Sequence, residues 1–192
     1  ELLSFWTVSL PTESLIALGL ADRWQVFQDR VRKELARLLQ RRGLPALVVG
    51  VVELQPRRSR ATGMPCPHLH VVFQGRTGRG AQWALRPGDL DGVIAAALTS
   101  AGVPVPDLRS AGNVQQVKKS VRAYLSKYMT KGSGDCARFV GRSHENLIPR
   151  QWWFWTKPLR RWVLQHILPV RFELLCWMHE NRRQLQELEL VR

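Results

Sequence analysis

The sequence predicts an α+β fold in which helices pack on a central antiparallel sheet. Short runs of alternating or β-branched residues are typical of strands, and longer segments with apolar residues every three or four positions are typical of helices. Along the 192-residue chain these segments follow in the order βα-ββ-αβ-α, which favours a sheet with helices packed on it. A composition of 45% apolar and 23% charged residues indicates a folded chain.

The first half of the chain contains three predicted strands. Alternation over residues 3–9 predicts the first strand, and a period of three to four over 20–41 predicts a long helix. Residues 46–54 are β-branched and apolar on both faces, which is typical of a central strand. Residues 56–67 are expected to form a basic loop, and 68–74 a strand that completes a long-looped antiparallel hairpin.

The second half begins with a glycine-rich turn over residues 75–80, which lacks the lysine of a phosphate-binding loop. A helix is expected over 89–101. A fourth strand over 108–117 should lead directly into a helix over 118–131, which Gly132 ends.

The predicted domain boundary follows this last helix. Residues 1–134 are expected to form the core domain. Residues 135–192 are expected to form a tryptophan-rich and then helical extension packed on that core.

The charge of the chain indicates a polyanionic partner. It carries 29 basic and 15 acidic residues, a net charge of +14, and 23 of the basic residues are arginine. Arginine binds phosphates in a fork and stacks on bases, so nucleic acid is the expected partner rather than an anionic membrane. No segment approaches about 18 consecutive apolar residues, so no membrane span is expected. Three scattered cysteines without a C-x-x-C pair indicate a reducing cytoplasm.

Two histidines and one glutamate are candidate metal ligands. His68 and His70 stand two apart on a predicted strand, so both side chains leave the same face. Glu53 is the only charge in the apolar strand before them, where a carboxylate is costly unless it is paired or bound to a cation. In the predicted hairpin Glu53 can lie across from the histidines as a third ligand. The alternatives are two partly exposed sheet histidines and a solvent-facing glutamate at a strand end.

The predicted helix over 118–131 carries candidate catalytic residues. Tyr124 and Tyr128 are the only tyrosines of the chain, and their spacing of four puts them on one helix face. Lys127 and Lys131 follow each tyrosine by three positions. A tyrosine hydroxyl can act as a covalent nucleophile once a nearby cation lowers the cost of the phenolate. The alternative is two aromatic rings that pack this helix on the sheet, with the lysines in solvent.

Together these residues resemble the HUH endonucleases, a superfamily named for its histidine-hydrophobe-histidine motif. The segment His68-Leu69-His70 is similar to the metal motif, and Glu53 lies where replication initiators keep a third polar ligand. Tyr124-Leu125-Ser126-Lys127 resembles the Y-x-x-K helix in initiator order, and Phe5-Trp6-Thr7-Val8-Ser9 resembles the first motif, on the first strand. The resemblance covers about residues 3–134.

This resemblance implies an RRM-like nuclease fold and a rolling-circle replication initiator (Rep). The implied enzyme uses Mg²⁺ or Mn²⁺ to nick and rejoin single-stranded DNA through a 5′-phosphotyrosine. The second tyrosine is similar to those of two-tyrosine phage initiators and Helitron-type transposases. The implied partners are single-stranded or hairpin DNA at an origin or element end, with a host helicase and polymerase. The implied location is the cytoplasm of a bacterium or of the host of a mobile element.

Residues outside these motifs supply candidate DNA contacts. Arg57, Arg58 and Arg60 in the expected loop are the candidates for duplex or hairpin binding, and a solvated loop without DNA contacts is the alternative. The aromatic block at residues 152–155 could stack single-stranded bases, but a packed satellite core is the favoured interpretation.

Two other classes of protein are alternatives. Histidine-triad nucleotide hydrolases need a third histidine where this chain has Val72. A non-catalytic nucleic-acid-binding module would explain the charge and the tryptophans, but not the histidine and tyrosine motifs.

Overall fold

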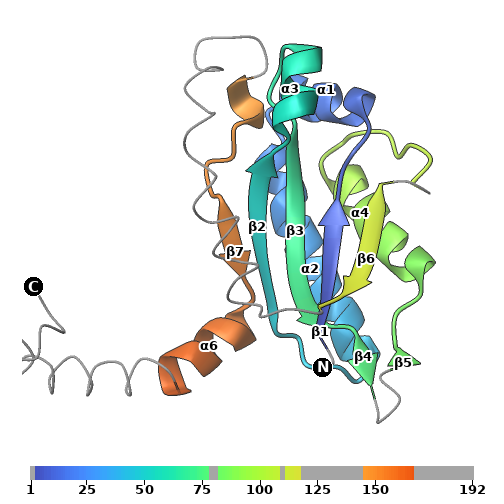
Figure 1. Ribbon diagram of the computed structural model, residues 1–192, viewed down its shortest axis with the longest axis vertical. Coiled ribbons are helices and arrows are strands. Elements are labelled where there is room, and N and C mark those ends of the chain that lie inside the picture. The colour runs from blue at the N-terminus through green and yellow to red at the C-terminus, as the bar shows by residue number, and fades with distance from the viewer. Residues whose placement is uncertain (1–2, 78–81, 109–110, 118–144, 167–192) are drawn as a thin grey trace, which may run out of the picture. The chain divides into compact units, whose positions relative to one another are not determined.

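The computed structural model describes residues 3–77, 82–108, 111–117 and 145–166 (Figure 1). Contacts divide the chain into two compact units, Glu1–Thr156 and Lys157–Arg192. Each unit is considered by itself. The described part of the second unit is helix α6, Lys157–His166.

The first unit is built on a five-stranded sheet in which every neighbouring pair is antiparallel. Its strands, in spatial order, are β6 (Gly112–Gln116), β1 (Leu3–Val8), β3 (Pro67–Gln74), β2 (Val48–Leu54) and β7 (Trp153–Trp155). The predicted α+β class is therefore confirmed at the level of an antiparallel sheet with helices. The prediction that the second strand is central is confirmed as well, because β2 lies between β3 and β7.

Helices lie behind one face of this sheet in the view of Figure 1. They are α1 (Thr12–Leu20), α2 (Trp24–Arg41) and α4 (Pro87–Ser100). Apolar side chains from alternate strand positions, such as Trp6, Leu69 and Phe73, join the helices in one core. Burial of this apolar face is the main favourable contribution to folding. A short hairpin, β4 (Arg76–Thr77) and β5 (Gln82–Trp83), and a 3₁₀ helix (Glu145–Leu147) also belong to this unit.

The opposite face of the sheet carries a different set of side chains. Phe5 and Val72, from positions that alternate with the main core, form a smaller apolar cluster there with Val117. Leu3 and Val49 pack against this cluster, whereas Thr7, His68, His70 and Gln74 are polar positions of β1 and β3 on the same face. Positions of alternating parity leave opposite faces of a strand, so the same sequence alternation that builds the core also builds this second face.

Strand β7 is held in register by a glycine. A Cβ at Gly50 would lie 2.2 Å from the ring of Phe154, which faces Gly50 across the ladder. Only glycine leaves room for this ring, and Phe154 thereby enters the helix-side core. The hydroxyl of Thr156 closes the strand by donating to the carbonyl of Ala46 at 2.6 Å and accepting from the amide of Val48. This register decides which way the neighbouring tryptophans face.

Two local predictions from the sequence differ from the structure. The helix expected over 20–41 is present as α2 but begins only at Trp24; the preceding helix, α1, was not predicted, and Asp22, with a positive φ of 50°, separates the two. The expected basic loop contains α3 (Pro56–Thr62). Proline at the first helical position and Gly63, with a φ of 69°, begin and end this helix.

The aromatic segment that the sequence placed in a C-terminal extension supplies an edge strand of the first unit. Strand β7 pairs with β2, and the contacts divide the chain after Thr156 rather than after residue 134. Across the described ranges, no helix has the length and apolar character needed to cross a bilayer.

Candidate metal centre

The pairing of β2 with β3 brings the three predicted ligands together. Glu53 lies directly opposite His68, and His70 lies opposite Val51, two positions along the same face. Directly paired residues in an antiparallel ladder point to the same side of the sheet. The carboxylate and both imidazoles therefore leave the face that does not bear α2 and α4.

The three ligand atoms form a nearly equilateral triangle. Oε2 of Glu53 lies 3.2 Å from Nε2 of His68 and 3.1 Å from Nε2 of His70, and the two nitrogens are 2.9 Å apart. The side chains of Glu53, His68 and His70 are 14, 11 and 6% exposed. Within the described part of the chain, this is the group whose donor atoms lie close enough to hold a metal ion.

The size of the triangle fits a shared divalent cation. Ligands about 2.1 Å from a metal and at right angles to one another lie roughly 3.0 Å apart, whereas tetrahedral angles spread them to roughly 3.4 Å. The observed separations match adjacent positions of an octahedral centre. Two imidazoles and a carboxylate suit Mn²⁺ and Fe²⁺ by ligand preference, and octahedral geometry also suits Mg²⁺.

Hydrogen bonds alone do not satisfy this arrangement. Each Nε2 has one in-plane position, which holds either a proton or a lone pair. If both nitrogens donate to Glu53, two N–H groups face each other at 2.9 Å. If Nε2 of one histidine donates its proton to Nε2 of the other, that proton is no longer directed at the carboxylate of Glu53. A cation at the centre removes this conflict, because each atom then directs a lone pair at the same point.

Strand β1 positions one of the imidazoles. Oγ1 of Thr7 lies 3.1 Å from Nδ1 of His70, its direct partner across the ladder. When Nδ1 carries the proton and donates it to this hydroxyl oxygen, Nε2 keeps the lone pair that a metal requires. The ring of Phe5 stacks on His70 with centroids 5.2 Å apart. The sequence interpretation assigned Thr7 no role, although its place on the polar side of the first strand was the available signal.

Electrostatics keeps the site in the state that binds cations. Burial raises the pKa of Glu53, but hydrogen bonds and charge attraction from His68 and His70 outweigh it and hold this pKa below its ordinary value. Burial lowers the pKa of His68, and the charge of Arg58 lowers it again, against the opposing effect of Glu53. An ionised carboxylate and a neutral imidazole are the protonation states that bind metals.

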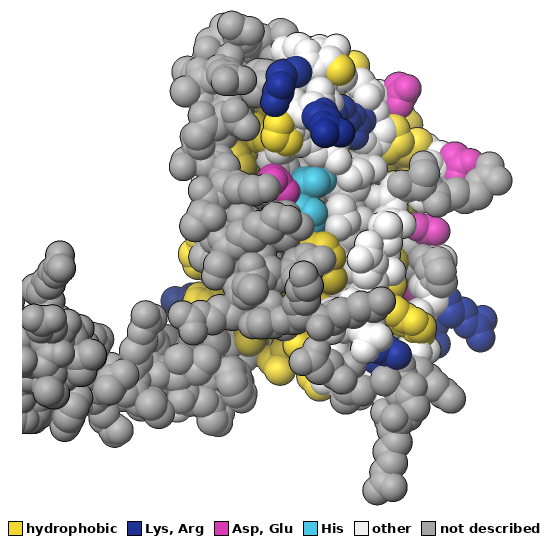
Figure 2. Space-filling view, in the orientation of Figure 1, with side chains coloured by type: hydrophobic (Ala, Val, Ile, Leu, Met, Phe, Trp, Pro, Cys, Tyr) yellow, Lys and Arg dark blue, Asp and Glu magenta, His cyan; other side chains and the backbone are white. Residues whose placement is uncertain are grey.

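The three arginines predicted to contact DNA lie on α3, next to the end of β2 that carries Glu53. Arg58 donates to the carbonyl of Leu10 at 2.7 Å and to Oγ1 of Thr12 at 2.8 Å, so its guanidinium ties α3 to the chain after β1. Arg57 and Arg60 are exposed. In Figure 2 both imidazoles lie on the visible face beside an acidic side chain, and basic side chains gather above them over α3.

The predicted catalytic helix cannot be compared with this geometry. Tyr124, Lys127, Tyr128 and Lys131 lie outside the described residues. Their roles stay predictions from the sequence.

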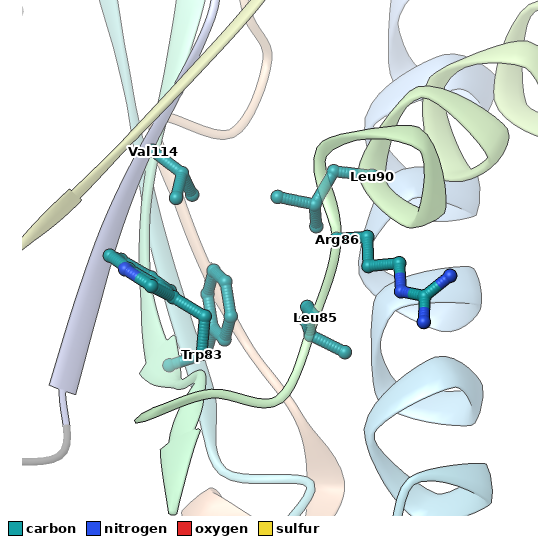
Figure 3. A pocket seen from close by; sticks show the side chains of 6 residues that line it. Trp83, Leu85, Arg86, Leu90 and Val114 are labelled. Atoms are coloured by element: carbon teal, nitrogen blue, oxygen red, sulfur yellow. The ribbon is translucent and has the colours of Figure 1, made fainter. Parts of the chain in front are cut away.

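A cavity of about 390 Å³ lies on the other side of the sheet. It is lined by Phe73, Trp83, Leu85, Arg86, Leu90 and Val114. Figure 3 shows Leu90 of α4 facing Val114 of β6, with Trp83 below them. Phe73 points to the helix side while His68 and His70 point away from it, so this cavity is not part of the metal centre.

Comparison of the chain with known protein families, with curated proteins and with solved structures finds no match. The interpretation of the site therefore rests on its geometry and on the sequence motifs.

The first prediction concerns the hydroxyl of Thr7. Thr7→Val keeps the shape of the side chain but removes the acceptor for Nδ1 of His70, so the affinity for Mn²⁺ should fall by about 10-fold, the lower end for such a supporting contact. Thr7→Ser retains the hydroxyl and is the matched control. Calorimetric titration measures both, and equal affinities for the valine and serine variants would rule out this supporting role.

The second prediction concerns pH. A proton and a cation compete for Nε2 of His68, so affinity falls as pH drops through the pKa of this residue. Since that pKa lies below the ordinary 6.5, Mn²⁺ affinity should change little from about pH 7.5 to pH 6.5. It should then fall by up to about tenfold per pH unit as His68 becomes protonated. A tenfold loss already above pH 6.5 would contradict the lowered pKa.

Proposed function

We propose that this protein is a metal-dependent endonuclease that nicks and rejoins single-stranded DNA, as the initiators of rolling-circle replication do. The observation that carries the proposal is the triangle of Glu53, His68 and His70 on the face of the sheet opposite α2 and α4. Two sequence features support it: the tyrosine–lysine motif downstream and the net charge of +14.

Glu53, His68 and His70 are the residues that would hold the metal, Mg²⁺ or Mn²⁺ in the cell. When bound, the cation would act as a Lewis acid on the scissile phosphate. Cellular availability favours Mg²⁺, whereas the two imidazoles favour Mn²⁺.

The tyrosines would supply the nucleophile. The phenolic oxygen of Tyr124 or Tyr128 forms a bond to phosphorus, and the bond from phosphorus to the 3′-oxygen breaks. That oxygen takes up a proton and leaves as a 3′-hydroxyl, while the 5′-phosphate stays on tyrosine. The positive charge of Lys127 or Lys131 lowers the cost of the phenolate. The reverse exchange reseals the strand without ATP, because the covalent link conserves the bond energy.

A labelled-strand assay tests this proposal. The protein is incubated with a pool of random single-stranded and hairpin oligonucleotides and Mn²⁺, with EDTA as the control, and run on a denaturing gel. A strand labelled at its 3′ end should shift to a protein-linked band, and one labelled at its 5′ end should give a shorter free fragment. Absence of a protein-linked band with Mn²⁺ would overturn the proposal.

The biological setting follows from the same chemistry. The free 3′-hydroxyl is the primer that a host polymerase extends, and a helicase would supply the unwound strand. If both tyrosines act in turn, the enzyme could transfer strands, as two-tyrosine phage initiators and Helitron-type transposases do.

A third prediction separates DNA contacts from structural arginines. Replacement of the exposed Arg57 and Arg60 by Gln should weaken DNA binding and reduce its salt dependence by up to about two phosphate contacts. Arg58→Gln removes two hydrogen bonds between α3 and the chain after β1, so we expect it to lower thermal stability instead. An unchanged salt slope in the double variant would place the DNA elsewhere.

A non-catalytic module that binds single-stranded nucleic acid is the second candidate. The observation that favours it is the 41% exposure of Trp153, since an exposed aromatic ring can stack a base without any chemistry. Binding without a covalent band in the labelled-strand assay would select this candidate.

A further inference from the structure

Two tryptophans share the face of the sheet that carries the metal centre. Trp153 pairs with Val51 and Trp155 with Val49, across the ladder between β7 and β2. Val51 is also the direct partner of His70 on its other side. Paired residues point to the same side of the sheet, so Trp153, Val51 and His70 form one row across this face.

The opposite side of β7 fixes this orientation. Phe154 enters the helix-side core over Gly50, where no larger residue fits. Because successive residues of a strand alternate between faces, burial of Phe154 directs Trp153 and Trp155 away from that core. Packing of Phe154 therefore holds the two tryptophans on the metal side of the sheet.

The two indoles are arranged so that one supports the other. Their ring centroids lie 5.2 Å apart at an interplanar angle of 84°, an edge-to-face contact. Such a contact limits rotation of the rings and contributes to stability beyond burial alone. Trp153 nevertheless keeps 41% of its surface exposed, which is unusual for a side chain of this size in a sheet.

We propose that Trp153, supported by Trp155, is a stacking platform for a base of the single strand, close to the nucleotide whose phosphate lies at the metal centre. Strands are spaced by about 4.8 Å, so Trp153 stands roughly 10 Å from His70 with β2 between them. Every base has an aromatic face, so the platform holds a strand without reading its sequence. The exposed Arg57 and Arg60 at the end of β2 add the positive charge that such a strand requires.

This inference rests on the single-stranded DNA substrate of the proposed function. It adds a subsite that neither the histidine motif nor the tyrosine motif supplies. The sequence interpretation favoured a packed core for this aromatic block, and the structure confirms it for Phe154, in the core, and for Trp152, packed against it. Trp153, in contrast, is exposed.

The test measures binding of a fluorescently labelled oligothymidine in EDTA, where metal-dependent cleavage does not interfere. Trp153→Ala should weaken binding by about 5- to 150-fold, and Trp153→Phe, which keeps a ring, should recover part of the loss. The salt dependence of binding should stay unchanged in both variants, because stacking releases no counterions. Circular dichroism checks that each variant is folded.

Trp83→Ala is the matched control. Trp83 is 45% exposed, close to the value for Trp153, but it lines the cavity on the helix side of the sheet. Its replacement should leave binding within about twofold of wild type. Equal losses in both alanine variants, or no loss in Trp153→Ala, would overturn the platform while leaving the proposed nuclease intact. Failure of the wild-type protein to bind the strand at all would overturn both.

Discussion

Replacement of both tyrosines by phenylalanine should abolish the covalent DNA adduct. The double variant Tyr124→Phe, Tyr128→Phe removes both phenolic oxygens of the chain and leaves no tyrosine to form the phosphodiester link. Loss of the nucleophile typically costs at least about 10³-fold in rate, which puts the band below detection on a denaturing gel. Because phenylalanine keeps both rings, binding of the uncleaved strand should be unaffected.

The two single variants serve as controls for each other. Tyr124 is the expected first nucleophile, because Tyr128 lies near the predicted end of its helix at Gly132. Cleavage lost in Tyr124→Phe and retained in Tyr128→Phe indicates one catalytic tyrosine. Retained first cleavage with lost strand transfer in one variant indicates that both act in turn. A covalent adduct that persists in the double variant would contradict the tyrosine mechanism.

Loss of a metal ligand should stop cleavage but not DNA binding. Lewis-acid stabilisation is worth several kcal/mol, so His70→Ala should slow cleavage by about 10³-fold or more. Glu53→Gln keeps the size of the side chain and removes only its charge, and it should behave in the same way. Binding to a single strand depends mainly on arginines and aromatic rings, and it should stay within about twofold of wild type.

Asp91→Asn is the control for this prediction, because Asp91 lies in α4, on the side of the sheet opposite the cluster. Equal loss of binding and cleavage in His70→Ala, with a lowered melting temperature, would show that the histidines support the fold instead.

The central part of the site could be predicted from the sequence because it depends on strand periodicity. The spacing of His68 and His70 puts them on one face of any strand, and a lone carboxylate in the apolar run before them needs a partner. A hairpin brings the two strands into register, and the structure brings Glu53 opposite His68. The antiparallel sheet and its main helices could be predicted for the same reason, because the period of apolar residues along each segment is a local pattern.

Other features depend on contacts between distant segments, and no local pattern reveals them. Strand β7 pairs with β2, which lies about 100 residues earlier in the chain. This pairing requires a glycine at position 50, because a Cβ there would collide with the ring of Phe154. The exposure of Trp153 follows from that pairing. Likewise, the role of Arg58 depends on the carbonyl of Leu10, 48 positions away. Helix α3 was missed because its apolar content is too low to give a periodic signal.

The measurement that tests the account most directly is the number of Mn²⁺ ions bound per chain, obtained from the loss of the free-ion signal in electron paramagnetic resonance. The account predicts one bound ion in the wild-type protein and in the Asp91→Asn control, and none in His68→Ala or His70→Ala under the same conditions. Glu53→Gln should bind far more weakly than wild type. A wild-type chain that binds no Mn²⁺, or histidine variants that bind it as well as wild type, would contradict the claim that Glu53, His68 and His70 form a metal centre.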